Sequence, residues 1–190
     1  MKKVIIENAL SEKVFGQVQE HMMSLQYNWH FGEGVATNNS KGDFQFMHTI
    51  HEGCYMDSQP DYQVVDAILE LLRPQLIIRI KANLLTITEE HKVHGMHVDN
   101  LIPGALTAIY YINTNNGYTI FEDGDKVESV ANRLVVFPAN TTHSGASCTD
   151  ELRRVVINLN FIPWRDDKNW HALMQPEDIA YRNHWEKGLT

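Results

Sequence analysis

Cysteine is scarce in this sequence, and long hydrophobic runs are absent. The 190 residues contain two cysteines, Cys54 and Cys148, which is too few for a disulfide framework. No apolar run approaches the roughly 18 residues that span a bilayer, and the apolar stretch at residues 4–6 is too short for a signal peptide. We therefore expect a protein of the reducing cytoplasm that is not inserted in a membrane.

Positive charge is also in short supply. Lys and Arg number 16 against 24 Asp and Glu, so the formal net charge is −8. Non-specific binding to nucleic acid depends on clustered cationic side chains, and we expect no nucleic-acid partner. The acidic balance fits a peptidyl or small-molecule substrate better. The oligomeric state stays open, a homodimer included.

The overall composition is that of an ordinary globular domain, with 43% hydrophobic and 21% charged residues. No repeat, low-complexity segment or linker divides the chain, and its length suits one domain. We therefore expect a single domain over residues 1–190. Within it, residues 1–75 form a helical support and substrate-side segment, residues 76–162 a β core, and residues 163–190 a C-terminal tail.

The first third of the chain predicts two helices. A short strand is expected at residues 3–6, and Ser11 is a plausible N-cap for the first helix. Pro60 can open the second helix and Pro74 closes it. Apolar residues recur at helical spacing in both segments: Val14, Phe15, Val18, Met22 and Leu25 in the first, and Val64, Val65, Ile68, Leu69 and Leu72 in the second.

From residue 75 onward the hydrophobic period changes to two. The expected strands cover residues 76–87, 107–112, 118–121, 134–137 and 154–161, with a further strand near residues 44–48. Turn signals separate the strands, and no helix is expected between them. This pattern is typical of an antiparallel sandwich or jelly roll (double-stranded β-helix), with the N-terminal helices packed on it.

The most informative motif is His97-Val98-Asp99, followed much later by His143. In a strand, residues i and i+2 point to the same face, so His97 and Asp99 can hold one metal ion. With 10 His and 11 Asp in the chain, chance alone produces about 0.6 His-x-Asp matches, so the motif needs its context. Two imidazoles and one carboxylate on one side of an ion are the ligand set of non-haem Fe(II) oxygenases.

Two other interpretations of these residues are weighed. His91, His94 and His97 at three-residue spacing suggest a zinc-binding run, although Gly95 argues against the helix that such spacing needs. Asp99 could instead form a turn ahead of the segment 101–104.

Several further motifs follow in a fixed order: a strand with two tyrosines, a Gly-x-Thr-x-Phe segment, a Phe-Pro strand end before His143, and arginine on the last strand. Over residues 76–162 this order resembles the Fe(II)/2-oxoglutarate-dependent oxygenases, especially their prolyl-hydroxylase-like branch. The matched pieces are residues 97–100, 107–113, 117–121, 137–138, 143 and 154.

The resemblance implies a role for each matched residue. His97, Asp99 and His143 would bind Fe(II), with 2-oxoglutarate and O₂ as co-substrates. Arg154 would hold the distal carboxylate of 2-oxoglutarate, since a guanidinium fork matches a carboxylate. Tyr111 would donate its hydroxyl to the same carboxylate.

The choice between Arg154 and Arg153 is open on the pattern alone. Arg154 is preferred because Asn158 stands four positions after it, where the family has a polar residue. Arg153 lies on the more apolar, core-like face of the same strand. Asn83 is a weaker candidate for the co-substrate pocket.

The chain also departs from the family pattern. Val156 replaces a small hydroxyl residue, and Leu84, Leu85 or Thr86 stands where many relatives have tyrosine.

The resemblance implies hydroxylation of a C–H bond with release of succinate and CO₂. We expect the substrate to approach the metal across the loops at residues 100–105 and 28–57. Four aromatic residues are available in the second segment, and core packing is expected for at least half of them: Trp29, Phe31, Phe44 and Phe46. Two alternatives remain, a cupin-like metalloenzyme that does not use 2-oxoglutarate and a non-catalytic jelly-roll binding protein.

Overall fold

The computed structural model describes residues 2–35, 43–53, 55–56, 59–164, 167–170 and 173. Its elements are β1 (Val4–Ile6), α1 (Glu12–Met23), β2 (His30–Glu33), β3 (Phe44–Glu52), β4 (Tyr55–Met56), α2 (Gln59–Leu72), β5 (Pro74–Thr86), β6 (Leu106–Tyr111), β7 (Tyr118–Phe121), β8 (Lys126–Glu128), β9 (Leu134–Pro138), β10 (His143–Gly145) and β11 (Arg153–Pro163). Cys54 and most of the C-terminal tail lie outside the described residues.

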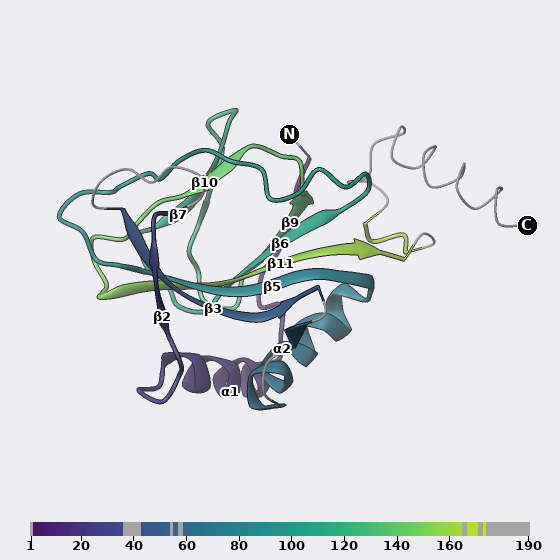
Figure 1. The fold of residues 1–190 in the computed structure, drawn as a ribbon, viewed down its shortest axis with the longest axis horizontal. Coiled ribbons are helices and arrows are strands. Elements are labelled where there is room, and N and C mark those ends of the chain that lie inside the picture. The colour runs from purple at the N-terminus through teal and green to yellow at the C-terminus, as the bar shows by residue number, and fades with distance from the viewer. Residues whose placement is uncertain are drawn as a thin grey trace, which may run out of the picture.

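The strands form two antiparallel sheets. The large sheet has the order β1-β9-β6-β11-β5-β3-β2, with β4 paired to β3, and the small sheet has the order β10-β7-β8. The small sheet lies over one face of the large sheet, and both helices lie under the other face (Figure 1). This is the predicted double-stranded β-helix with the N-terminal helices packed on it.

One apolar core joins the helices to the large sheet. Helix α1 buries Val18 and Met22, and helix α2 buries Ile68. These side chains pack against the outward residues of the central strands, such as Ile80 on β5 and Ile157 on β11. A smaller core fills the space between the two sheets; it consists of Ile109, Tyr111, Phe121, Val127, Val135, Phe137 and Val156.

Alternation along β11 and β5 directs their side chains in turn toward the core shared with the helices, here called the helix-side core, and toward the space between the two sheets. On β11, Val155 and Ile157 belong to the helix-side core, whereas Arg154 and Asn158 line a cavity on the opposite face. Arg154 and Asn158 therefore share one face, as the strand pattern predicts.

The first helix ends earlier than its apolar stripe predicts. Ser24 adopts an extended conformation with φ −70° and ψ 161°, so the helix stops at Met23. The prediction that Leu25 belongs to the buried stripe is therefore wrong, since its side chain is 94% exposed. Ser11 does occupy the N-cap position, although its side chain makes no capping hydrogen bond.

Each strand expected from the sequence is present, with bounds that move by a few residues. The short strands β2, β4, β8 and β10 were not predicted. Among the described residues, neither helix has the length and apolar character needed to cross a bilayer.

Candidate metal centre and cavity

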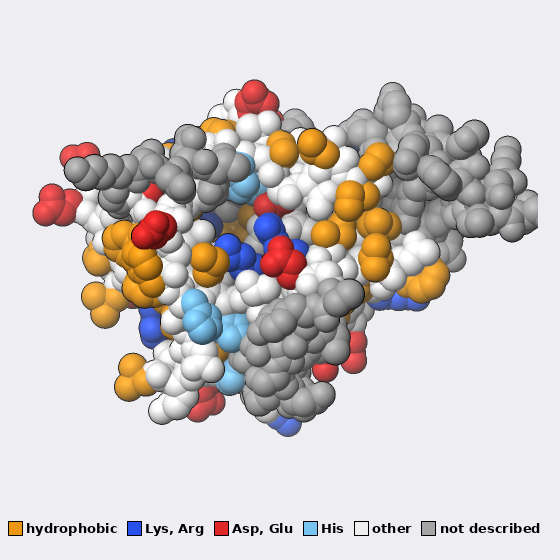
Figure 2. All heavy atoms as spheres, viewed as in Figure 1, with side chains coloured by type: hydrophobic (Ala, Val, Ile, Leu, Met, Phe, Trp, Pro, Cys, Tyr) orange, Lys and Arg blue, Asp and Glu red, His pale blue; other side chains and the backbone are white. Residues whose placement is uncertain are grey.

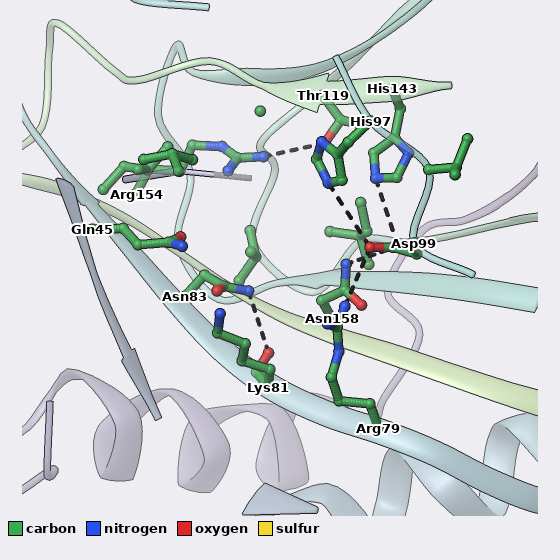
Figure 3. Close-up of a pocket in the computed structure, with 16 residues that line it drawn as sticks. Gln45, Arg79, Lys81, Asn83, His97, Asp99, Thr119, His143, Arg154 and Asn158 are labelled. Carbon is green, nitrogen blue, oxygen red and sulfur yellow. Dashed lines mark hydrogen bonds and ion pairs between the residues drawn. The ribbon is translucent and has the colours of Figure 1, made fainter. Parts of the chain in front are cut away.

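His97 and His143 face each other across an isolated antiparallel bridge. Each backbone N–H donates to the carbonyl of the other residue, at 2.9 Å in both directions. Asp99 follows two residues after His97, and one ligand atom from each of the three side chains lies within 4.8 Å of the others. The His97 Nε2 and His143 Nε2 atoms lie 3.8 Å and 3.7 Å from the two Asp99 oxygens (Figure 3). The predicted triad is thus brought together.

Backbone carbonyls orient both imidazoles. His97 Nδ1 lies 3.1 Å from the Gly95 carbonyl oxygen, and His143 Nδ1 lies 2.9 Å from that of Thr141. A carbonyl can only accept, so Nδ1 carries a proton in each ring, and Nε2, on the side of Asp99, is the nitrogen that can bind a metal. Burial lowers the pKa of His143, although the Asp99 carboxylate acts to raise it. The lowered pKa favours the neutral ring, which is the form that can bind a cation.

Asp99 is held as a carboxylate by a set of donors. Thr107 Oγ1 and Asn158 Nδ2 donate to its Oδ2 at 2.8 Å and 3.2 Å, and Arg79 pairs with its Oδ1 at 3.3 Å. Burial acts to raise the pKa of Asp99, but His143, the two hydrogen bonds and Arg79 together lower it. Such partners of a ligand residue fix its orientation.

The structure does not agree with the two alternatives, a turn formed by Asp99 and a zinc-binding run of histidines. Asn100 forms the local turn, because its Oδ1 accepts the Ile102 N–H at 2.8 Å. His91 is bonded to the Ser147 carbonyl, and His94 lies 3.7 Å from Asp43, so neither joins His97 in a zinc cluster.

The donor set therefore fits a metal of intermediate hardness with open positions. Two imidazoles and one carboxylate on one side match the ligands of Fe(II). Among the described residues no fourth His, Cys, Asp or Glu joins this group.

Arg154 lies in the same cavity as the triad. Its side chain is 4% exposed, with Nε donating to Ser129 Oγ at 2.7 Å and a terminal nitrogen donating to Thr119 Oγ1 at 3.2 Å. Within the described residues no carboxylate forms an ion pair with it. An unpaired buried charge is costly, and Arg154 therefore suits a carboxylate supplied by a ligand.

The remaining predicted site residues fall in different places. Arg153 points the other way, and its guanidinium donates to the Met23 carbonyl at 2.7 Å. Asn83 lines the cavity. Tyr111 is fully buried, lies under the Arg154 guanidinium at 5.5 Å, and donates to Thr119 Oγ1 at 2.8 Å. Thr119, and not Tyr111, is among the residues that line the cavity.

Sequence reasoning did not assign functions to Thr119, Ser129, Gly117 or Arg79. The Gly-x-Thr-x-Phe segment could have drawn attention to the first of these, because Thr119 connects Tyr111 to Arg154. Gly117 leaves room for the Arg154 stem, since a Cβ there would lie 2.7 Å from Arg154 Cδ.

The cavity has a volume of about 390 Å³ and opens to solvent. Four strands provide its large-sheet side, through Gln45 on β3, Arg79 and Asn83 on β5, Ile109 on β6, and Asn158 on β11. Figure 2 shows Lys and Arg side chains gathered in the centre of this face, beside acidic and histidine side chains.

The aromatic residues of the substrate-side segment lie elsewhere. Trp29 and Phe46 pack against the helix-side core, whereas Phe31 and Phe44 are 61% and 41% exposed and stack on each other. None of the four lines the cavity.

No family model and no curated protein matches the chain. Solved structures do. A prolyl hydroxylase from Trichoplax adhaerens, in complex with a hypoxia inducible factor peptide fragment, matches with TM-score 0.59 and 15% identity over 84% of this chain and 83% of its own. A Pseudomonas putida prolyl-4-hydroxylase matches with TM-score 0.58 and 16% identity over 85% and 92%. The chain has the fold of the 2OG-Fe(II) oxygenases.

This fold accommodates more than one reaction. The epimerase SnoN, solved with Fe³⁺, alpha ketoglutarate and nogalamycin RO, matches with TM-score 0.59 and 15% identity over 85% of this chain and 78% of its own. The resemblance predicted from the motifs is therefore confirmed at the level of the oxygenase fold. The fold alone does not determine which reaction is catalysed.

Proposed function

We propose that the protein is an Fe(II)- and 2-oxoglutarate-dependent dioxygenase that hydroxylates a C–H bond of a peptidyl or small-molecule substrate. One observation carries the proposal: a cavity with a His-Asp-His triad at one place and, at another, a buried arginine that no carboxylate of the described residues pairs with. The oxygenase fold of the chain supports it.

The triad would hold the metal through His97 Nε2, His143 Nε2 and one oxygen of Asp99. When bound, Fe(II) with 2-oxoglutarate and O₂ supplies the oxidation of a C–H bond, with release of succinate and CO₂. The three protein ligands lie on one side, so the opposite side is left for these small molecules.

Arg154 would bind the distal carboxylate of 2-oxoglutarate. Its Nε is already bonded to Ser129, which sets the plane of the guanidinium, and Thr119 lies between it and Tyr111. We propose that Tyr111 acts through Thr119, by holding the hydroxyl that faces the ligand. Fixing the co-substrate in one orientation is the main contribution of these residues.

Asn83 would provide a further polar contact from β5. Arg153 has its guanidinium engaged by helix α1, so we assign the carboxylate to Arg154 alone. A reducing compartment such as the cytoplasm, which keeps iron as Fe(II), is the setting that we propose.

The test is an anaerobic Fe(II) titration with and without 2-oxoglutarate, followed by visible absorption. The unaltered protein should develop a weak charge-transfer band only when both are present. Asp99→Ala should lose metal binding while its thermal unfolding stays cooperative. An unchanged iron affinity in that variant would show that the triad is not the metal site.

Arg154→Gln and Arg153→Gln form a matched pair, since both remove one positive charge from adjacent positions. Arg154→Gln should weaken 2-oxoglutarate binding by about tenfold or more and spare the metal, because it removes a charge-assisted hydrogen bond. Arg153→Gln should leave the affinity unchanged. Metal binding without 2-oxoglutarate binding in the unaltered protein would favour a cupin-like enzyme, and absence of both would favour a binding protein.

A further inference from the structure

The inward face of β5 carries an unusual row of polar side chains. Arg79, Lys81 and Asn83 occupy alternate positions and all three line the cavity, while Ile80 and Ala82 between them are buried in the helix-side core. The apolar residues fix the orientation of the strand, and this forces the polar side chains into the cavity.

The cavity is cationic in a protein of negative net charge. Arg79, Lys81 and Arg154 line it, and among the described residues that line it Asp99 is the one carboxylate. The whole chain carries a formal net charge of −8. Glu52, opposite Arg79 in the β3–β5 register, is exposed, and within the described residues it forms no ion pair with either β5 cation.

Lys81 is the cation whose presence the proposed oxygenase does not explain. Its side chain is half-buried, and in the described part of the chain its ammonium has neither a hydrogen-bond acceptor nor an ion pair. Burial, and after it the neighbouring Arg79, lower the pKa of Lys81 against the opposing effects of Glu52 and Asp99, and the net lowering reflects the cost of holding this charge away from water. Figure 3 shows the ammonium directed into the cavity, beside Asn83 and Gln45.

The other charges of the cavity have partners once the metal and co-substrate are in place. Arg79 is paired with Asp99 at 3.3 Å. Arg154 would take the distal carboxylate of 2-oxoglutarate, and Fe(II) would take Asp99 and the carboxylate at the other end. Lys81 is then left without an ion pair among the residues that the structure describes, although Glu52 and Asp99 act on it at longer range. Two atoms of other residues that line the cavity, Asn158 Oδ1 and Arg79 Nε, are buried and have no hydrogen-bond partner among the described residues.

We infer that the substrate of this proposed dioxygenase is an anion, and that Lys81 binds its carboxylate or phosphate group inside the cavity. The inference rests on the proposed function. Arg79 Nε would donate to the same molecule, and Asn158 Oδ1 would accept from a hydroxyl or amine on it. The volume of about 390 Å³ is at the lower end for ligand cavities, so the anionic part that enters is small.

The probes are acetate, methyl phosphate and uncharged acetamide, added to protein that is loaded with Mn(II) and saturated with 2-oxoglutarate. Paramagnetic broadening of the probe protons reports binding near the metal, and Mg(II)-loaded protein gives the diamagnetic reference. At least one of the two anions should be broadened, and acetamide should not. Preference for acetate identifies a carboxylate substrate, and preference for methyl phosphate identifies a phosphate ester.

Lys81→Gln should reduce the affinity for the anion by about tenfold or more, because the ammonium provides a charge-assisted hydrogen bond. The matched control is Lys126→Gln on β8, an exposed lysine over the Tyr118 ring that does not line the cavity. It makes the same change of charge and should leave anion binding unaltered. The affinity of Lys81→Gln for 2-oxoglutarate should equal that of the unaltered protein.

Two results would overturn the inference while leaving the proposed function in place. One is loading with Mn(II) and 2-oxoglutarate but no broadening of either anion. The other is a loss of 2-oxoglutarate affinity in Lys81→Gln as large as that in Arg154→Gln, which would assign Lys81 to the co-substrate. Failure of the unaltered protein to bind Mn(II) or 2-oxoglutarate would overturn the proposed function, and the inference with it.

Discussion

Replacement of Gly117 by alanine is the substitution for which the structure makes the sharpest prediction. An added Cβ would lie 2.7 Å from Arg154 Cδ, 2.8 Å from Asn115 Oδ1 and 3.0 Å from the backbone oxygen of Ala146. Asn115 cannot move freely, because its Oδ1 accepts the Gly117 N–H at 3.0 Å. Arg154 is therefore the neighbour that must shift.

Overpacking of this kind costs about 1–3 kcal/mol. For a domain of this size each kcal/mol lowers Tm by about 2–4 °C, so Gly117→Ala should lower Tm by about 2–12 °C. The displaced guanidinium should also bind 2-oxoglutarate about tenfold more weakly, since a charged hydrogen bond is sensitive to alignment. Differential scanning fluorimetry and a 2-oxoglutarate titration of the Mn(II)-loaded protein measure the two effects.

Gly16→Ala is the matched control. Gly16 lies on the exposed side of α1, and an added Cβ would meet nothing within 4 Å. Alanine is the better helix former by about 0.5–1 kcal/mol, so this variant should be stabilised and should bind 2-oxoglutarate normally. Equal Tm and equal 2-oxoglutarate affinity in Gly117→Ala and the unaltered protein would refute the argument that Gly117 leaves space for Arg154.

The Asn132 side chain forms hydrogen bonds with the backbone N–H and carbonyl of Leu10 and accepts one from the Tyr110 hydroxyl. The backbone of Asn132 is left-handed, with φ 63°. Asn132→Ala should therefore lower the free energy of unfolding in urea by about 3–5 kcal/mol. Asn132→Gly should cost less, and equal losses would mean that the left-handed backbone contributes nothing. Cys148 is fully buried, and burial raises the pKa of its thiol, so less thiolate is present at a given pH. Iodoacetamide at pH 8 should therefore label the native protein far more slowly than the urea-unfolded chain, and similar rates would contradict the buried position.

The strands that carry the fold were predictable because their alternation is long. β11 spans 11 residues, and its two faces separate a polar set from an apolar set in the sequence itself. That separation was enough to place Arg154 and Asn158 on one face, whereas the preference for Arg154 over Arg153 came from the family resemblance. The short strands β8 and β10 span three residues each, which is too few for a period to be recognised.

The cationic row on β5 was not predictable in the same way. Alternation shows that Arg79 and Lys81 share a face, but a polar face is ordinarily the solvent face of a sheet. The small sheet and the segment 97–99, which pack over that face from distant parts of the chain, turn it into the wall of a cavity. The roles of Ser129 and Thr119 depend on the same long-range arrangement, since these residues precede Arg154 by 25 and 35 positions.

Leu25 shows a local limit of periodicity. It continues the apolar stripe of α1 in sequence, but Ser24 leaves the helical conformation, and the side chain that should have been buried is in solvent. A spacing pattern identifies a helix well and its last turn poorly.

The reciprocal backbone hydrogen bonds between His97 and His143 have a consequence for how the proposed metal centre would take up and release an ion. The backbone hydrogen bonds fix the distance between the two imidazole rings, and three neighbouring side chains hold Asp99 in place. The three side chains that would bind a metal are therefore already positioned in the folded protein without the ion. Binding of an ion should therefore require little further ordering of the backbone and side chains around the centre. A chelator should consequently remove a bound metal ion from the proposed centre and leave a folded protein that binds the ion again without refolding.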